Sequence, residues 1–319
     1  MEENSAIAPQ ECPAIVNSSE RLKGIDVFVA VAAAGSFAAA ADRLNLTGSA
    51  VGKSIARLEA RLSTRLFERT TRKLQLTDAG TAFHRVCLRV LEDIESAERV
   101  LASDTAEPSG RLRVDVPATF GRRQVMAWLM AFAVDHPAVQ LHVSFTDRFV
   151  DVVDDGIDVA VRIGGADTWP ANLGHRFLGK ERLIFCASPA YLERKGVPAT
   201  LDDLLLSSHD AITYGRADGT ASPWLISQGA SPTERRAVDS RIVVGDGEAQ
   251  LDAVVAGLGV AQLATWLAGD ALRAGQLVPI LPDYDLEGLP LHIVWPRSKR
   301  LLPKVDSLLG HLAEQLRVR

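Results

Sequence analysis

The segment spanning residues 36–62 constrains the fold of this chain most strongly, because it predicts two short helices joined by a tight turn. Ser36 is a favourable N-cap before an alanine-rich run, and Asn45 suits a left-handed turn position between the two helices. The second helix is expected over about residues 47–62, where apolar residues recur every three or four positions: Val51, Ile55, Leu58 and Leu62. One face of this helix is therefore expected to be buried, while the other is free to meet a partner.

The outward face of that second helix suits DNA. Its small N-terminal residues let a phosphate approach the helix end, where unpaired N–H groups and the helix dipole attract anions. Lys53 and Arg57, one turn apart, can reach guanine acceptors or phosphates. The alternative is an ordinary packed helix pair with a solvated face. The predicted DNA-contacting residues are Thr47, Gly48, Ser49, Lys53, Ser54 and Arg57, followed by Arg65, Arg69, Arg72 and Lys73.

Residues 67–76 predict a short β-hairpin with a basic tip, in which Leu74 and Leu76 point inward. A helix-turn-helix followed by a basic hairpin is typical of a winged helix, whose wing touches the DNA backbone or the minor groove. From Arg43 to Lys73 there are eight basic residues and two acidic ones, a local net charge of +6 in a chain whose net charge is −5. The positive field is therefore confined to this patch, which favours DNA over a merely solvated face.

Several short motifs in this region, taken in order, resemble the DNA-binding end of a LysR-type transcriptional regulator. The resemblance covers about sixty residues and implies an N-terminal all-α winged helix-turn-helix (residues 21–76) with a long linker helix. It further implies a C-terminal α/β two-lobed domain like a periplasmic binding protein. In one departure, the family commonly has Ser or Thr where this chain has Gly52, so base preference cannot be carried over. The motifs are Ile25-Asp26-Val27-Phe28, Ala33, Gly35-Ser36-Phe37, Ser49-Ala50-Val51, Ile55, Arg57-Leu58-Glu59, Leu62, Leu66-Phe67-Glu68-Arg69 and Leu76-Thr77-Asp78-Ala79-Gly80.

A long helix is expected over residues 77–102, with Thr77 as its cap. Its apolar positions repeat at alternating steps of four and three, which is a heptad seam typical of paired helices. The alternative is a helix packed against its own domain. We expect a homodimer, because two copies would present two recognition helices to two half-sites; the resemblance implies the same, and a homotetramer is also open. The predicted dimer seam consists of Phe83, Cys87, Val90, Ile94, Ala97 and Leu101.

The first twenty residues and the three cysteines give no indication of a secretory signal or of a metal site. Residues 1–20 contain four acids and no Lys or Arg, so they lack the basic start of a secretory signal and are expected to form a disordered extension. Cys12, Cys87 and Cys186 have no metal-ligand spacing and are expected to be reduced thiols in a cytoplasm. No apolar run approaches the roughly twenty residues that span a bilayer. We therefore expect a cytoplasmic protein that neither uses a membrane nor binds a metal.

The second part of the chain predicts an α/β domain. Residues 103–110 are polar, with Pro and Gly, and are interpreted as a hinge. Strand–helix alternation follows over residues 111–319 and predicts a parallel sheet with helices on both faces. The resemblance implies an effector-binding domain with one lobe of about residues 111–163 plus 264–319 and another of about residues 164–263. Strands are expected at 112–116, 139–145, 157–163, 183–187, 211–214, 242–244, 259–263 and 291–295, and helices at 121–134, 149–155, 247–256 and 302–317.

An effector cleft is expected beyond the carboxyl ends of the strands, near helix N-termini. Thr119 and the N–H groups of Gly121 and Gly247 could hold a carboxylate, with Arg148 or Arg162 as counter-charge. A small anionic effector is therefore a hypothesis. Equally, Arg162 could pair with Asp158, and Thr119 could be a plain helix cap. The predicted effector-binding residues are Ala118, Thr119, Phe120, Gly121, Arg148, Arg162, Gly164, Tyr214, Asp246 and Gly247.

Enzyme motifs are weak. Residues 245–250 approach the dinucleotide fingerprint but lack its third glycine, and the chain has no phosphate loop ending in Gly-Lys-Ser/Thr, no HExxH and no GxSxG. We therefore predict no catalytic residues and no cofactor. The leading function is a sequence-specific DNA-binding regulator controlled by a small molecule. The alternative is an α/β ligand-binding or catalytic protein whose N-terminal helices serve only oligomerisation.

Overall fold

The computed structural model describes residues 22–69, 74–102, 107–148, 150–165, 168–205, 209–216, 218–227 and 233–316. The predicted extension at residues 1–20, the wing-tip residues Arg72 and Lys73, and the first half of the predicted hinge lie outside the described residues. The chain divides into two compact units, Met1–Glu98 and Arg99–Arg319. Within the described residues, no helix combines the length and the apolar character that a membrane crossing requires.

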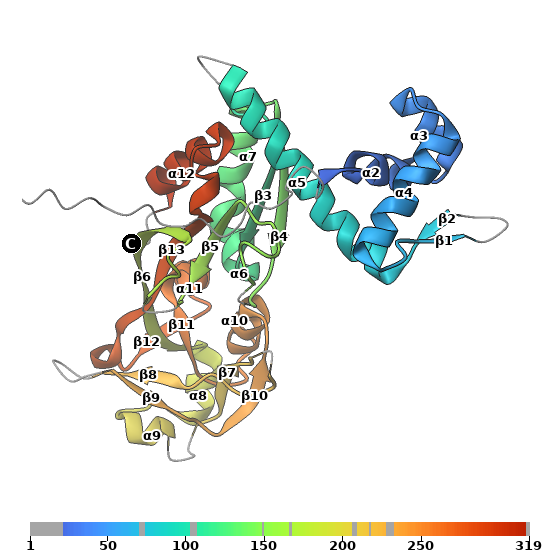
Figure 1. Cartoon of the computed structure of the whole chain (residues 1–319). Helices are drawn as coiled ribbons and strands as arrows, with labels where there is room; N and C mark the ends of the chain where they lie inside the picture. Colours follow the sequence, from blue (N-terminus) through green and yellow to red (C-terminus); the bar gives the residue numbers. More distant parts are fainter. Residues whose placement is uncertain are drawn as a thin grey trace, which may run out of the picture. The chain divides into compact units, whose positions relative to one another are not determined.

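The first unit is a small helical bundle closed by a two-stranded hairpin (Figure 1). Its centre is Phe28, which is fully buried and lies 5.4 Å, between ring centroids, from both Phe67 and Phe83. Phe28 therefore joins the first helix, the hairpin and the long helix in one core. The elements are α2 (Ile25–Ala34), α3 (Phe37–Leu44), α4 (Gly48–Leu62), β1 (Phe67–Arg69), β2 (Leu74–Leu76) and α5 (Asp78–Ala102).

The predicted turn between α3 and α4 is confirmed. Ser36 caps α3 by accepting a hydrogen bond from the backbone N–H of Ala39, and Asn45 ends it at φ 53°. Thr47 caps α4 in the same way, by accepting from the N–H of Ala50. The first helix begins at Ile25, because Gly24 before it has the left-handed φ of 81°. Leu22 is half exposed.

The hairpin predicted over residues 67–76 is confirmed as an antiparallel pair, with Phe67 opposite Leu76. Helix α5 follows at once, because Thr77 accepts a hydrogen bond from the N–H of Gly80 at 2.9 Å and donates one to the carbonyl of Arg65. A Cβ atom at Gly80 would lie 2.0 Å from the carbonyl oxygen of Leu66. A glycine is therefore required where α5 passes the start of the hairpin.

The second unit is built on a mixed seven-stranded sheet in the order β11-β6-β13-β5-β3-β4, with β12 beside β6. Strand β3 (Gly110–Val116) runs parallel to β4 (Val139–Phe145) and β5 (Val159–Ile163), as predicted. Strands β13 (Leu286–Pro296) and β6 (Leu173–Ala187) are antiparallel neighbours, so the prediction of a purely parallel sheet was wrong. Only the buried ends of these two long strands had been predicted.

The first lobe packs helices on one face of this sheet. A continuous helical segment comprises α6 (Ala118–Phe120), a π-helical turn (Gly121–Val125) and α7 (Met126–Asp135), and α12 (Pro303–Gln315) lies beside α7 (Figure 1). Leu112, Leu129, Phe132, Ile293 and Leu308 are fully buried in its core. The helix predicted at residues 149–155 is not formed; there, the carboxylate of Asp151 accepts hydrogen bonds from the N–H groups of Val153 and Asp154 and makes a turn.

The second lobe holds the parallel pair β7 and β10 and two further core clusters. Ala268, Ala271 and Leu277 pack there with Cys186 and Ile212, so helix α11 belongs to this lobe and not to the first, where a division at residue 264 had put it. The expected two-lobed α/β architecture is nevertheless confirmed. The elements are α8 (Pro189–Lys195), α9 (Leu201–Leu205), β7 (Ala211–Tyr214), β8 (Trp224–Ile226), β9 (Glu234–Arg236), β10 (Ser240–Val244), α10 (Gly247–Val255), β11 (Ala261–Ala264), α11 (Thr265–Arg273) and β12 (Val278–Ile280).

Candidate functional site

The outer face of α4 is available to a partner. Val51, Ile55 and Leu58 are buried on its inner side, while Gly48, Ser49, Lys53 and Arg57 are exposed on the other side. The periodicity therefore predicted the orientation of this helix correctly. Its use in DNA binding stays a prediction at this stage, as does that of Arg65, which is exposed just after the helix. Of the hairpin residues, Arg72 and Lys73 lie outside the described part of the chain, as does the side chain of Arg69.

Two predicted residues, Thr47 and Ser54, and the family departure at Gly52 have specific structural settings. Thr47 is the N-cap, and its Oγ1 lies 3.2 Å from Oγ of Ser49. Ser54 is half buried and lies against the first helix, since a Cβ atom at Gly24 would be 2.9 Å from its Oγ. Gly52 has open space: a Cβ atom there would meet nothing within 4 Å. Ser54 therefore supports the bundle, whereas position 52 could hold a larger side chain.

Glu59 was missed by the sequence reasoning and positions the hairpin. Its Oε1 accepts hydrogen bonds from the backbone N–H groups of Leu66, at 2.8 Å, and Phe67, at 3.2 Å. A carboxylate with two backbone donors holds the start of the wing against the C-terminal turn of α4. The only signal was that Glu59 is the single acid between Arg43 and Arg65.

The predicted dimer seam on α5 needs correction at its first positions. Cys87 is 1% exposed in the core of its own unit, and Phe83 packs against the same core. These two side chains are therefore used inside the monomer, because the helical bundle needs α5 to cover it. Val90 is half buried and Ile94 is exposed; the side chains of Ala97 and Leu101 are not among those described.

The second unit contains a cavity of about 580 Å³ between its two lobes. Six of the ten predicted effector residues line it, and they come from α6, from the loop after β4, from the carboxyl ends of β5 and β7, and from the start of α10. Ala118, Gly121, Gly164 and Asp246 do not line it. The six are Thr119, Phe120, Arg148, Arg162, Tyr214 and Gly247.

The four predicted residues outside the lining have structural roles instead. The N–H of Gly121 donates to the carbonyl of Pro117 at 2.6 Å, so it is not free for an anion, and a Cβ atom there would collide with Val116 at 2.2 Å. The N–H of Ala118 donates to Asp147, and that of Gly164, at φ 78°, to Pro290. Asp246 caps α10 by accepting from the N–H of Ala249.

Arg162 forms a buried ion pair, but with Asp115 rather than with Asp158. Its Nη1 lies 2.6 Å from Oδ1 of Asp115, and both side chains are almost fully buried. Asp158 instead pairs with Lys299, also at 2.6 Å. The second terminal nitrogen of Arg162, Nη2, has no hydrogen-bond partner among the described residues. The wall of the cavity thus holds a guanidinium with unused donor capacity.

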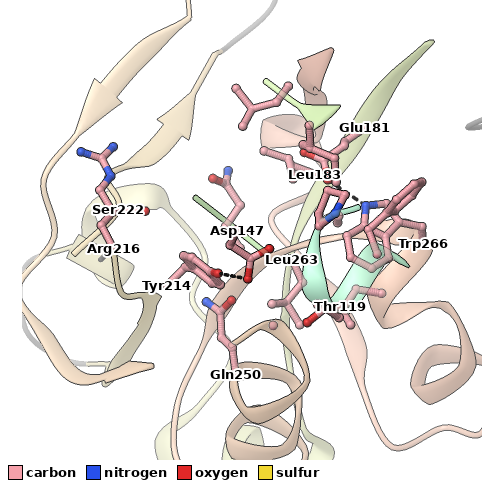
Figure 2. A pocket seen from close by; sticks show the side chains of 18 of the residues that line it. Thr119, Asp147, Glu181, Leu183, Tyr214, Arg216, Ser222, Gln250, Leu263 and Trp266 are labelled. Atoms are coloured by element: carbon pink, nitrogen blue, oxygen red, sulfur yellow. Dashed lines mark hydrogen bonds between the residues drawn. The ribbon is translucent and has the colours of Figure 1, made fainter. Parts of the chain in front are cut away.

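Polar contacts cross the cleft on one side of the cavity. The hydroxyl of Tyr214 donates to Asp147 (Figure 2), and Arg122 pairs with Asp246 and Glu248 at 3.3 and 2.6 Å. Oγ1 of Thr119 lies 3.5 Å from Oδ2 of Asp246, so it joins the lobes and is not a plain helix cap. The N–H of Ala249 and the guanidinium of Arg122 lower the pKa of Asp246, which keeps its carboxylate charged for these contacts.

The cavity is lined by four arginines and two acids, with apolar side chains between them. Its charged residues are Arg148, Arg162, Arg216 and Arg235 against Asp147 and Glu181. Residues on β6, β8, β11 and α11 also line the cavity and were not predicted as site residues. They are Glu181, Leu183, Leu225, Gln262, Leu263, Ala264, Trp266 and Leu267.

Neither a metal centre nor a reactive thiol is found in the described part of the chain. No group of three or more His, Cys, Asp or Glu side chains is arranged to hold a metal ion there. Cys87 and Cys186 are buried, and burial raises their thiol pKa values to about 11 and about 12. Both thiols are therefore protonated near neutral pH and unsuited to nucleophilic chemistry.

Both units match models of the same protein family. Residues 22–81 match the model of the bacterial regulatory helix-turn-helix proteins of the lysR family, and residues 105–317 match the LysR substrate binding domain. An HTH-type transcriptional regulator of Haemophilus influenzae is 34% identical over 91% of this chain and 98% of its own length. An HTH-type transcriptional repressor of Pseudomonas aeruginosa is also 34% identical, over 92% of each chain. The solved structure of CrgA, a LysR-type transcriptional regulator from Neisseria meningitidis, is 25% identical, covers 91% of this chain and 97% of its own, and has a TM-score of 0.58.

Proposed function

Because the chain belongs to the LysR family of transcriptional regulators, we propose that a small organic anion, bound in the cleft of its second unit, controls how its helix-turn-helix unit acts on DNA. Members of this family bind DNA and small-molecule effectors and form oligomers; they are not enzymes. Membership therefore decides against the alternative of a catalytic α/β protein with N-terminal helices used only for assembly.

The proposal of an anionic effector is supported mainly by the charged side chains that line the cavity. Four arginines face two acids there, and Asp147 is already engaged by the hydroxyl of Tyr214 and the N–H of Ala118. The buried guanidinium of Arg162 keeps an unused N–H group beside its ion pair with Asp115. A carboxylate satisfies such donors with charge-assisted hydrogen bonds, and the surrounding apolar side chains would cover a compact organic body.

On the DNA side, we propose that α4 enters the major groove. Its exposed Ser49, Lys53 and Arg57 are the groups for base edges and phosphates, and Arg65 and the basic hairpin are the groups for the flanking backbone. A homodimer, or a homotetramer made of two dimers, would place two such helices on two half-sites. A protein that regulates transcription in this way works in the cytoplasm, where the DNA is.

The test combines footprinting with calorimetry. DNase footprinting of the promoter beside its own gene, with and without candidate organic acids, should show two half-sites and a footprint that changes with the effector. Calorimetry on the full chain should then show binding of that acid, weakened in Arg148→Ala and unchanged in Arg176→Ala, an exposed arginine outside the cavity lining. Absence of binding for every acid tested, or equal binding by both variants, would remove the anion proposal.

A further inference from the structure

Glu181 is a buried acid on the cavity wall that an anionic ligand alone does not use. It lies on β6 and is 7% exposed. Its Oε1 accepts a hydrogen bond from Nε1 of Trp266 at 2.8 Å (Figure 2). The two side chains form a fixed polar edge in a wall that is otherwise largely apolar, with Leu183 and Leu263 close by.

Within the part of the chain that the structure describes, no cation is paired with Glu181. Its neighbours on the strand, Lys180 and Arg182, are paired with Glu287 at 2.8 Å and with Asp285 at 3.1 Å. Among the residues that the structure describes, none forms an ion pair with Glu181. Burial raises the pKa of this carboxyl, although the N–H groups of Trp266 and Leu289 act in the opposite direction. A buried acid without a counter-charge is costly to keep, and such groups concentrate at functional sites.

The acid and the buried guanidinium occupy different places in the cavity wall. Arg162 lies on β5 and Glu181 on β6, and β13 runs between these two strands. Arg162 pairs with His292 and His292 with Phe177, so Glu181 lies four residues farther along β6. Two inter-strand spacings and this offset along the strand separate the two backbones by roughly 16 Å. The remaining charged residues of the lining are Asp147, which bonds to Tyr214, and Arg148, Arg216 and Arg235, which are exposed at the cavity edge. The cavity therefore offers an arginine-rich region and a separate buried acid.

We propose that the effector is a zwitterion of the amino-acid type, whose carboxylate is bound by the arginines and whose protonated amine is bound by Glu181. This inference rests on the proposed function, since it names the class of the anion in that same cleft. A ligand with only a hydroxyl at this end would leave Glu181 uncompensated, whereas an ammonium group supplies the cation that the protein lacks. On binding, the ammonium keeps its three protons, and a protonated Glu181 releases its own proton to solvent.

The inference is tested by calorimetry on the full chain with the twenty protein amino acids, each beside its des-amino analogue, such as phenylalanine beside 3-phenylpropionate. The expected result is that at least one amino acid binds and its des-amino partner binds at least tenfold more weakly. In Glu181→Gln the amino acid should lose about 10- to 100-fold in affinity, because one charge-assisted bond is removed. Binding of the amino acid to the parent protein should release a proton, which is measured by calorimetry in two buffers of different ionisation enthalpy. This proton release should be absent in Glu181→Gln. Glu287→Gln, an exposed acid outside the cavity, should behave like the parent.

Two outcomes would overturn the inference. If des-amino acids bind as tightly as amino acids, and Glu181→Gln leaves their affinity unchanged, the amine site is wrong while the anion proposal stands. If neither series binds, both are wrong. Should Glu181→Gln fail to fold, the ligand pairs and the proton release measured on the parent protein still decide.

Discussion

The hydroxyl of Tyr214 lies 3.0 Å from Oδ2 of Asp147, and this hydrogen bond joins the two lobes across the cleft. Tyr214 ends β7 in the second lobe, and Asp147 follows β4 in the first. The other oxygen of Asp147 accepts the N–H of Ala118, so the carboxylate is held in place. Burial, and then the charge of Asp147, raises the pKa of Tyr214, so its hydroxyl keeps the proton that it donates. The Tyr214–Asp147 hydrogen bond, called the clasp below, therefore stabilises the closed arrangement of the two lobes beside the cavity.

Tyr214→Phe should loosen this clasp. The variant removes only the hydroxyl, and a hydrogen bond of this kind contributes about 1 kcal/mol, which corresponds to roughly fivefold in the equilibrium between closed and open lobes. Hydrogen exchange at residues 146–148 and 214–216 should become faster, and a bound effector should dissociate faster. Tyr284→Phe, away from the cavity, serves as the control. Unchanged exchange in these two segments would show that the clasp does not hold the lobes.

Lys53→Ala and Arg57→Ala should each cost about 1–3 kcal/mol of binding to the natural operator if these side chains read bases. They are exposed one turn apart on the outer face of α4, and no described residue of their own unit covers them. Binding measured at several salt concentrations separates two roles, because the loss of a phosphate contact lowers the salt dependence and weakens binding to random DNA equally. Arg61→Ala, in the last turn of the same helix, is the matched control. Operator binding equal to the parent in both variants would contradict the proposed groove contact.

Position 52 offers a test of how this chain differs from its family. A Cβ atom at Gly52 meets nothing within 4 Å, and the residue lies in the interior of α4. Gly52→Ala should therefore stabilise the first unit by about 0.5–1 kcal/mol in urea unfolding, through helix propensity alone. Gly52→Ser should stabilise it by less, and any difference in DNA affinity between the two variants isolates the hydroxyl. A destabilised Gly52→Ala variant would show that the site is not open.

The first unit could be predicted in detail because local signals set it. Ser36, Asn45 and Thr77 act as caps or turn residues through their own backbone neighbours, so the sequence contains the whole interaction. Glu59 could not be predicted in the same way. It bonds to backbone groups seven and eight residues away, and no helical or strand period links those positions.

The cleft could be predicted only in part, for a related reason. The carboxyl ends of parallel strands were recognisable, and Thr119, Arg148 and Tyr214 lie at or just after them. Glu181 was missed because it comes from the middle of the long strand β6. Trp266 was missed because it starts α11, and the antiparallel pairing of β11 with β6 brings it to Glu181. The partner of Arg162 was wrong for the same reason. Asp158 lies on the same stretch of chain, whereas Asp115 is brought to it by the pairing of β3 with β5.

Glu181→Gln should stabilise the ligand-free protein at neutral pH. Because burial raises the pKa of Glu181 in the folded state, that state binds its proton more tightly than the unfolded chain does. The stability that this group contributes is therefore lost as the pH rises above the ordinary glutamate pKa of about 4.5. A glutamine at this position does not titrate, so the variant does not lose this stability. The difference in unfolding midpoint between variant and parent, followed by tryptophan fluorescence in urea, should grow from pH 5 to pH 8. Glu287→Gln should show no such growth, since Glu287 is exposed and paired with Lys180. A difference that stays constant over this range would mean that Glu181 is compensated in the free protein, and would remove the physical reason for assigning it a cationic ligand group.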